Sequence, residues 1–126
     1  MLKRILIVDD NENHLEILKE TLDYFNFSIK TLSNGKDLVT IVENFKPDLL
    51  LLDYILPGTD NGLDLCRKLK NNIKTEEIPI ILMSGYQMLL DQFSGCNGVL
   101  YKPFDLDLLI EKIDALLGTH SLVQHS

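Results

Sequence analysis

The sequence predicts one α/β domain with a doubly wound (βα)5 pattern, in which helices cover both faces of a five-stranded parallel sheet. The first observation is that five apolar runs of strand length alternate with segments of helical period. The second is that this alternation is regular, which requires helical crossovers between parallel strands. The third is size: 126 residues, of which 45% are hydrophobic and 25% charged, suffice for a single core.

The five predicted strands differ in how strongly the apolar pattern marks them. RILIV at residues 4–8 and DLLLL at residues 48–52 are almost wholly apolar, which is typical of strands buried on both faces. FSIKTL at residues 27–32 alternates apolar and polar side chains, as a half-exposed strand does. IPIILM at residues 78–83 and GVLY at residues 98–101 complete the set.

Four segments carry apolar residues at every third or fourth position and are predicted to be amphipathic helices. The first starts at Asn11, the second spans residues 38–45 and the third spans residues 63–69. The last runs from about 105 to 118, between an aspartate suited to a helix start and a glycine suited to a helix end. A further, short helix is compatible with residues 87–93.

The charge and the ends of the chain set limits on its surroundings. The formal net charge of −7 and the pI of about 4.8 argue against direct contact with nucleic acid. The apolar run ILIV near the start is too short for a secretion signal, and no run reaches the length of a membrane span. We expect a cytoplasmic protein without membrane contact, with residues 1–118 as the domain and residues 119–126 as a flexible tail.

Cysteine and histidine residues receive structural interpretations at this stage. Cys66 and Cys96 lack the spacing of a metal site, so we interpret them as buried thiols, with a disulfide or metal pair as the alternative. Such thiols fit a reducing compartment. His14 falls in the first turn of the first helix and is predicted to be solvated, apart from the acidic residues described next.

Polar side chains stand where four of the predicted strands end. Asp9 and Asp10 follow the first strand, Asp53 the third, Ser84 the fourth and Lys102 the fifth. In the strand order 2-1-3-4-5, which is common for such sheets, these four strands are contiguous and their carboxyl ends meet at one cleft. We therefore expect a functional site at this edge.

The residue types at this edge predict a cation and phosphoryl chemistry. Three carboxylates brought together repel one another unless a cation lies among them. Oxygen ligands suit Mg²⁺, which takes a few carboxylates and often a phosphate oxygen. The hydroxyl of Ser84 and the amine of Lys102 complete a set able to stabilise a phosphoryl group in transfer, and an aspartate can itself be the nucleophile.

With these residues the sequence resembles the receiver domain of two-component response regulators. The motifs ILIVDD, LLLLDYILPG, ILMSG and KPF stand in the family's order and close to its spacing, within residues 3–117. The resemblance implies the strand order 2-1-3-4-5 and a signalling phosphoacceptor, an enzyme at most toward its own phosphorylation and dephosphorylation. The phosphoryl donor would be a phosphohistidine of a sensor kinase or phosphotransfer protein, and a downstream target or output domain would be the second partner.

The resemblance also implies a role for each site residue. Asp53 would be the phosphoacceptor. Asp10 and Asp53 would bind Mg²⁺ through their side chains and Ile55 through its backbone carbonyl, whereas Asp9 would hold the ion through water.

For the phosphoryl group itself, the resemblance assigns two residues. Ser84 would bind a phosphoryl oxygen and move when Asp53 is phosphorylated, and Lys102 would pair with the phosphoryl group. The bond between Lys102 and Pro103 is expected to be cis, which proline makes accessible.

The sequence departs from the family's pattern at its switch and tuning positions. The aromatic residue usual three positions before the lysine is Val99 here, so the aromatic switch is absent or is carried by Tyr101 or Tyr86. Ile55 and Tyr86 occupy positions that tune hydrolysis in the family, and their bulk favours a comparatively long-lived phosphorylated Asp53. The span from Ser84 to the lysine is about one helical turn short, which predicts a fourth helix that is shortened or is replaced by an irregular segment around SGCNG.

Three other interpretations compete with a phosphorylatable receiver. A haloacid-dehalogenase-type phosphatase needs a second acid two residues after the nucleophile, where Ile55 stands. A flavodoxin-like FMN binder needs a phosphate-cradling loop after the first strand, but DDNENH is acidic there. A degenerate receiver that acts only as a phosphorylation-independent protein-binding module is the alternative, although all five site positions are filled.

Overall fold

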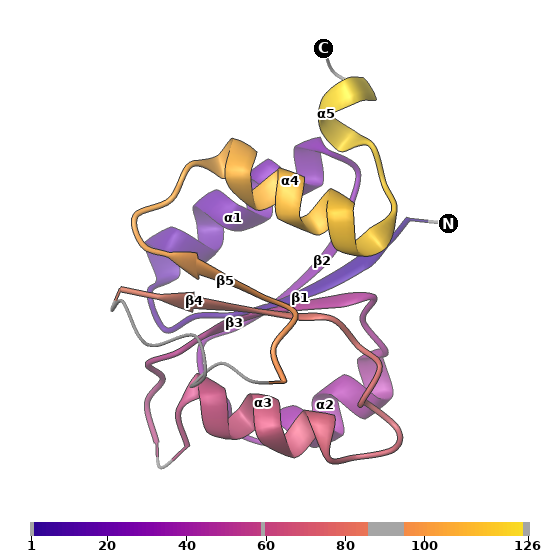
Figure 1. Cartoon of the computed structure of the whole chain (residues 1–126). Helices are drawn as coiled ribbons and strands as arrows, with labels where there is room; N and C mark the ends of the chain where they lie inside the picture. Colours follow the sequence, from indigo (N-terminus) through magenta and orange to yellow (C-terminus); the bar gives the residue numbers. More distant parts are fainter. Residues whose placement is uncertain (1, 59, 86–94, 125–126) are drawn as a thin grey trace.

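The computed structural model of the chain describes residues 2–58, 60–85 and 95–124 (Figure 1). No helix within these ranges has the length and apolar character needed to cross a membrane. The sheet has five parallel strands in the order β2-β1-β3-β4-β5, as predicted. The strands are β1 (Arg4–Val8), β2 (Ser28–Leu32), β3 (Leu49–Asp53), β4 (Ile80–Ser84) and β5 (Gly98–Tyr101).

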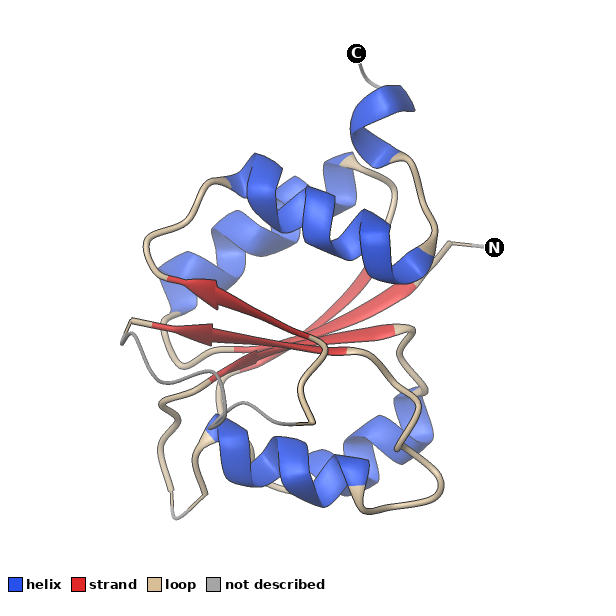
Figure 2. Ribbon diagram, in the orientation of Figure 1, coloured by secondary structure: helices blue, strands red, loops and turns tan. Residues whose placement is uncertain are grey.

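Helices lie on both faces of the sheet, which gives three layers (Figure 2). One face carries α1 (Glu12–Tyr24) and α4 (Leu106–Leu117), and the other carries α2 (Leu38–Phe45) and α3 (Gly62–Lys70). A short helix, α5 (Ser121–Gln124), follows α4. The short helix predicted at residues 87–93, between β4 and β5, falls outside the described residues. This segment is the predicted shortened fourth helix of the (βα)5 pattern and is distinct from α4.

Each inner strand supplies side chains to two separate cores. In β3 every residue is buried. Leu49 and Leu51 face the core shared with α1 and α4, and Leu50 and Leu52 face the core shared with α2 and α3. Because successive residues of a strand point to opposite faces, a run of four leucines fills both cores at once.

The sheet extends further toward its carboxyl edge than the apolar runs predict. β3 ends at Asp53 and β4 at Ser84, one residue beyond the predicted ends at 52 and 83. β4 also begins later than predicted, directly after Pro79, which has no backbone N–H for the ladder. Asp53 and Ser84 are therefore strand residues with backbones held by the sheet, rather than the first residues of loops.

Residues 119–124, which the sequence analysis assigns to a flexible tail, continue from α4 into α5. Gly118 ends α4 in the left-handed conformation, with φ at 71°, and turns the chain back. The carboxylate of Asp114 then accepts hydrogen bonds from the Thr119 hydroxyl and from Ser121, whose N–H and hydroxyl lie 2.9 and 2.7 Å away. Leu122 packs against the core shared with α1 and α4. Part of the segment after residue 118 therefore contacts α4 and this core.

We expect the substitution Leu51→Ala to lower the free energy of unfolding by about 2 to 5 kcal/mol, because a fully buried leucine leaves a cavity between the sheet and two helices. Urea unfolding measures the loss. Ile73→Ala is the control, since Ile73 is 85% exposed and its truncation should cost less than about 0.5 kcal/mol. Equal losses in the two variants would contradict this account of the core.

Candidate functional site

The carboxyl edge of the sheet is held by backbone hydrogen bonds up to the predicted site residues. The bonds link neighbouring strand ends in the order β2-β1, β3-β4 and β4-β5. The N–H groups of Asp9, Tyr54 and Lys102 donate to the carbonyls of Leu32, Met83 and Ser84 at 3.0, 2.8 and 2.7 Å. The four strand ends therefore present their side chains from a rigid frame.

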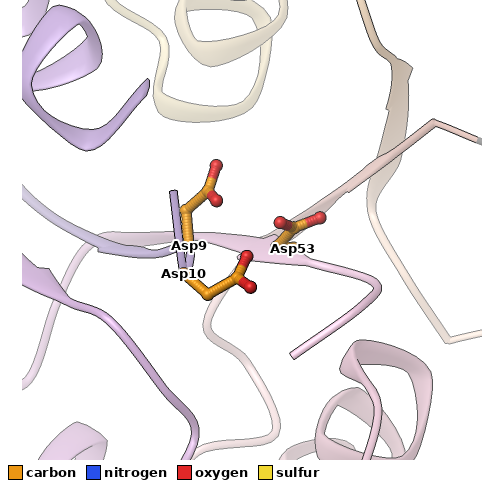
Figure 3. Close-up of side chains that lie close together, drawn as sticks. All are labelled: Asp9, Asp10 and Asp53. Atoms are coloured by element: carbon orange, nitrogen blue, oxygen red, sulfur yellow. The ribbon is translucent and has the colours of Figure 1, made fainter. Parts of the chain in front are cut away.

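Three aspartates gather at this edge (Figure 3). One carboxylate oxygen from each of Asp9, Asp10 and Asp53 lies within 4.8 Å of the others. Asp9 is fully buried and Asp53 is 6% exposed, whereas Asp10 is exposed. Within the part of the chain that the structure describes, Asp10 has no hydrogen bond or ion pair, so its carboxylate is open to a ligand. Two acids of the cluster are therefore buried, and the third, Asp10, is exposed to solvent.

Lys102 bridges the two buried carboxylates. Its Nζ atom lies 3.1 Å from Oδ2 of Asp9 and 3.1 Å from Oδ2 of Asp53. Burial disfavours the ammonium charge, but the two carboxylates outweigh burial and raise the pKa of Lys102 above its ordinary value. The bond between Lys102 and Pro103 is cis, which confirms that prediction.

Asp9 and Asp53 share this lysine but have pKa values displaced in opposite directions. Burial and the charge of Asp9 raise the pKa of Asp53 to about 6, and Lys102 offsets only part of this effect. Burial also acts to raise the pKa of Asp9. There it is outweighed by hydrogen bonds from His14 and from the N–H of Asn11 and by the charge of Lys102, so the pKa of Asp9 lies below its ordinary value.

His14 is a site residue that the sequence analysis missed. Its Nδ1 atom is hydrogen-bonded to Oδ2 of Asp9, and its ring packs edge-on against Phe104 at a centroid distance of 5.8 Å. The prediction of a solvated His14 apart from the acidic cluster is therefore wrong. Side chains in the first turn of a helix lean back toward the preceding segment, and this direction could have indicated the contact.

The remaining predicted residues occupy different surroundings. Ser84 is buried at the end of β4, beside Tyr101 of β5 in the register of the sheet. Ile55, two residues after the central aspartate, is 50% exposed. Val99 is partly buried and packs against the core shared with α2 and α3, and Tyr101 is also partly buried. Tyr86 lies outside the described residues.

Gly62 brings the start of α3 against the end of β3. Its N–H donates to the carbonyl of Tyr54 at 2.6 Å. A Cβ atom at Gly62 would lie 2.9 Å from the carbonyl carbon of Asp53, closer than real side chains approach. Because glycine has no side chain, Gly62 at the start of α3 can lie directly against the backbone at the end of β3.

The family model of the response regulator receiver domain matches residues 5–114. The chain belongs to this family. A curated relative, the phosphate regulon transcriptional regulatory protein PhoB of Rhizobium meliloti (strain 1021), is 31% identical over 121 residues, covering 93% of this chain and 53% of that protein. The chain spans from about a quarter to about half of the length of curated relatives such as this one.

Solved structures of receiver domains share the fold. A CheY-like response regulator receiver domain protein from Methanospirillum hungatei JF-1 is 30% identical, with a TM-score of 0.85 over 94% of this chain and 95% of that chain. The receiver domain of sensor histidine kinase PA1611 from Pseudomonas aeruginosa PAO1 is 23% identical, with a TM-score of 0.83 over 94% of this chain and all of that one. That domain was solved with a magnesium ion coordinated in the active site cleft. The receiver fold and the strand order predicted from the sequence are confirmed.

We expect Asp53→Asn to stabilise the receiver domain increasingly as the pH rises from about 4 to about 6. The pKa of Asp53 is about 6 in the folded chain, above its ordinary value of 3.8, so the folded state holds this proton more tightly than the unfolded state. The stability gained from that proton is present below pH 4 and is lost as the pH rises through 6. The neutral amide of Asp53→Asn does not lose this stability. Above pH 6 the free energy of unfolding of the variant should therefore exceed that of the parent by roughly 1 to 3 kcal/mol.

Urea unfolding at a series of pH values from 4 to 8 measures this difference. Leu51→Ala serves as the control, because it changes no titratable group and its cost should not follow the same pH profile. A stability difference between Asp53→Asn and the parent that is equal at pH 4 and pH 8 would contradict the assignment.

Proposed function

We propose that this receiver domain accepts a phosphoryl group on Asp53 with the help of Mg²⁺, from a phosphohistidine of a sensor kinase or phosphotransfer protein. The observation that carries the proposal is the bridge of Lys102 between Asp9 and Asp53, beside the open carboxylate of Asp10. Nothing in the site favours the alternative of a degenerate receiver, because each of the five positions holds the residue type that phosphoryl transfer needs.

The donor set fits a magnesium ion. The three aspartates offer only oxygen ligands within 4.8 Å of one another, and Mg²⁺ prefers oxygen ligands in proteins. Asp10 and Asp53 would bind the ion directly, together with the backbone carbonyl of Ile55. Both oxygens of Asp9 already accept hydrogen bonds, Oδ1 from Asn11 and Oδ2 from Lys102, which supports a role for Asp9 through water. Bound Mg²⁺ would supply positive charge to the phosphoryl oxygens.

The side chains of the site can carry out the transfer. With a pKa of about 6, Asp53 is mostly ionised at neutral pH and can attack phosphorus as a carboxylate. A new bond forms between its oxygen and phosphorus, while the bond from phosphorus to the histidine nitrogen breaks and the imidazole leaves with that electron pair. Lys102 and the hydroxyl of Ser84 stand at neighbouring strand ends, where they would pair with phosphoryl oxygens.

Transfer would also change the contacts that hold the resting site. The Oδ2 atom of Asp53 now accepts a hydrogen bond from Lys102, and a phosphoryl group would draw the lysine toward its own oxygens. Ser84 would move toward the phosphoryl group. Val99 stands where the family usually has an aromatic switch residue, so Tyr101 or Tyr86 would follow Ser84 in its place. The bulk of Ile55 beside the site supports slow hydrolysis of the phosphorylated state.

We also propose limits to this function. The chain would act in the cytoplasm as a signalling phosphoacceptor, with no catalysis beyond its own phosphorylation and dephosphorylation and no membrane contact. A downstream protein or output domain would read its state. Residues 1–126 carry a net charge of −7, so we propose no nucleic-acid contact for them. The name of the relative PhoB, a transcriptional regulatory protein, describes a chain about twice as long, so this last proposal covers only the present residues.

We expect incubation with acetyl phosphate and Mg²⁺ to add one phosphoryl group to the parent protein, measured by intact mass. Asp53→Asn should abolish the gain, because the amide is not a nucleophile. Chelation of the metal should also abolish it. Asp107→Asn, which changes an exposed acid in the first turn of α4 outside the cluster of Asp9, Asp10 and Asp53, is the matched control and should be phosphorylated like the parent. A parent protein that gains no mass under these conditions would refute the proposed function.

We expect saturating Mg²⁺ to raise the thermal unfolding midpoint of the parent by a few degrees, because an ion that binds only the folded state stabilises it. Asp10→Asn should weaken Mg²⁺ binding by roughly tenfold or more, since it removes the open carboxylate of the cluster. Thermal unfolding over a range of Mg²⁺ concentrations measures the affinity. An unchanged affinity in Asp10→Asn, with Asp107→Asn as the control, would exclude Asp10 as a ligand.

A further inference from the structure

The two cysteines of the chain meet although they are 30 positions apart in the sequence. Cys66 comes from the middle of α3, and Cys96 lies two residues before β5. Their Sγ atoms are 3.3 Å apart, and both are free thiols. A disulfide between them requires the sulfurs to close to about 2.05 Å.

The fold holds both sulfurs in place from separate elements. Cys66 is fully buried in the core shared with α2 and α3, and Cys96 packs against the same core while remaining partly exposed. The residue after it, Asn97, exchanges two hydrogen bonds with Ile80 at the start of β4, at 2.8 and 2.9 Å. Because α3 and the segment before β5 are each anchored independently, the contact between the sulfurs is a product of the folded state.

The surroundings favour loss of one proton from this pair. A hydrogen bond from the thiol of Cys96 lowers the pKa of Cys66, burial opposes this effect, and the positive charges of Lys70 and Arg67 add to it. The pKa of Cys96 is raised, chiefly because its thiol is hydrogen-bonded to Cys66. Lys70 is held near by its hydrogen bonds to the carbonyls of Glu76 and Ile78, at 3.2 and 2.7 Å. Of the two thiols, Cys66 is therefore the one that gives up its proton more readily.

We propose that Cys66 and Cys96 form a reversible intramolecular disulfide when the protein meets a hydroperoxide. The proposal rests on the contact between two anchored sulfurs, one buried and one reachable from solvent, and it is independent of the proposed phosphoryl transfer. The product would join α3 covalently to the segment that leads into β5. In a reducing compartment, such a bond forms transiently and is reversed by thiols.

The chemistry needs one hydroperoxide molecule for each disulfide. When the pair loses one proton to solvent, the remaining proton can pass to Cys66 and leave the more exposed Cys96 as the thiolate. This thiolate attacks hydrogen peroxide, takes one oxygen as a sulfenic acid and releases hydroxide, which takes up a proton from solvent and becomes water. The thiol of Cys66 then attacks the Cys96 sulfur, and the sulfur–oxygen bond breaks. The departing oxygen takes the thiol proton and leaves as a second water. Two electrons pass from the two thiols to the peroxide.

The test treats the reduced protein with hydrogen peroxide and follows its intact mass and its alkylatable thiols. We expect both thiols to disappear together with a mass loss of about 2 Da, for two hydrogens, and a dithiol to restore them. Peptide mapping should identify the link between Cys66 and Cys96. The same protein unfolded in urea should form the link more slowly, by roughly tenfold or more, because the sulfurs are no longer held together.

Two single variants give the order of the steps. Cys66→Ala, which avoids a buried hydroxyl in the core, should accumulate a sulfenic acid on Cys96 that a cyclic dione traps. Cys96→Ala should leave the buried Cys66 reacting more slowly than the parent pair, by roughly tenfold or more. Parent protein that keeps both thiols under peroxide, or that forms linked dimers or sulfinic acids in place of the internal link, would overturn the proposal. Equal rates of linkage in the folded and unfolded chain would do the same.

Discussion

One ammonium group lies between two buried carboxylates at the end of the sheet, and the character of the site depends on that bridge. Lys102 stands 3.1 Å from both Asp9 and Asp53, in surroundings where charges interact strongly because water is largely excluded. A single positive charge cannot satisfy both acids equally. Asp9 also accepts hydrogen bonds from His14 and Asn11, whereas among the described residues the carboxylate of Asp53 accepts one from the lysine alone. The acid with the less satisfied carboxylate is the one that the proposed chemistry uses as nucleophile.

The sheet and most of this site could be predicted from the sequence, because a sheet buried on both faces produces a recognisable pattern of apolar residues. Strands such as β3, buried along their whole length, require uninterrupted apolar runs, and helices on both faces require regular stripes. Once the strand order is known, the convergence of Asp9, Asp10, Asp53 and Lys102 follows, because the carboxyl ends of parallel strands meet at one edge. The boundaries were less accurate, because the ladder continues into polar residues and the apolar runs stop before them.

The contacts that could not be predicted are those between side chains of separate elements. His14 carries no apolar signal of its own, and periodicity reports only which side of α1 faces the core. The Asp114 carboxylate that holds Ser121, and the meeting of Cys66 with Cys96, depend on rotamers and on exact helix placement. These contacts share a second property: each joins a helix to a segment at the end of a strand or helix, where sequence patterns are shortest and packing decides the conformation.

The hydrogen bond between Gly62 and Tyr54 makes the position of Asp53 independent of the length of the loop between those two residues. The N–H of Gly62 closes the backbone on Tyr54, so both ends of the intervening loop are fixed within hydrogen-bonding distance of each other. Residues inserted between these ends would extend the loop into solvent, at a cost that grows only slowly with length, and would leave Asp53 where the sheet holds it. This loop can therefore change in length without displacing Asp53.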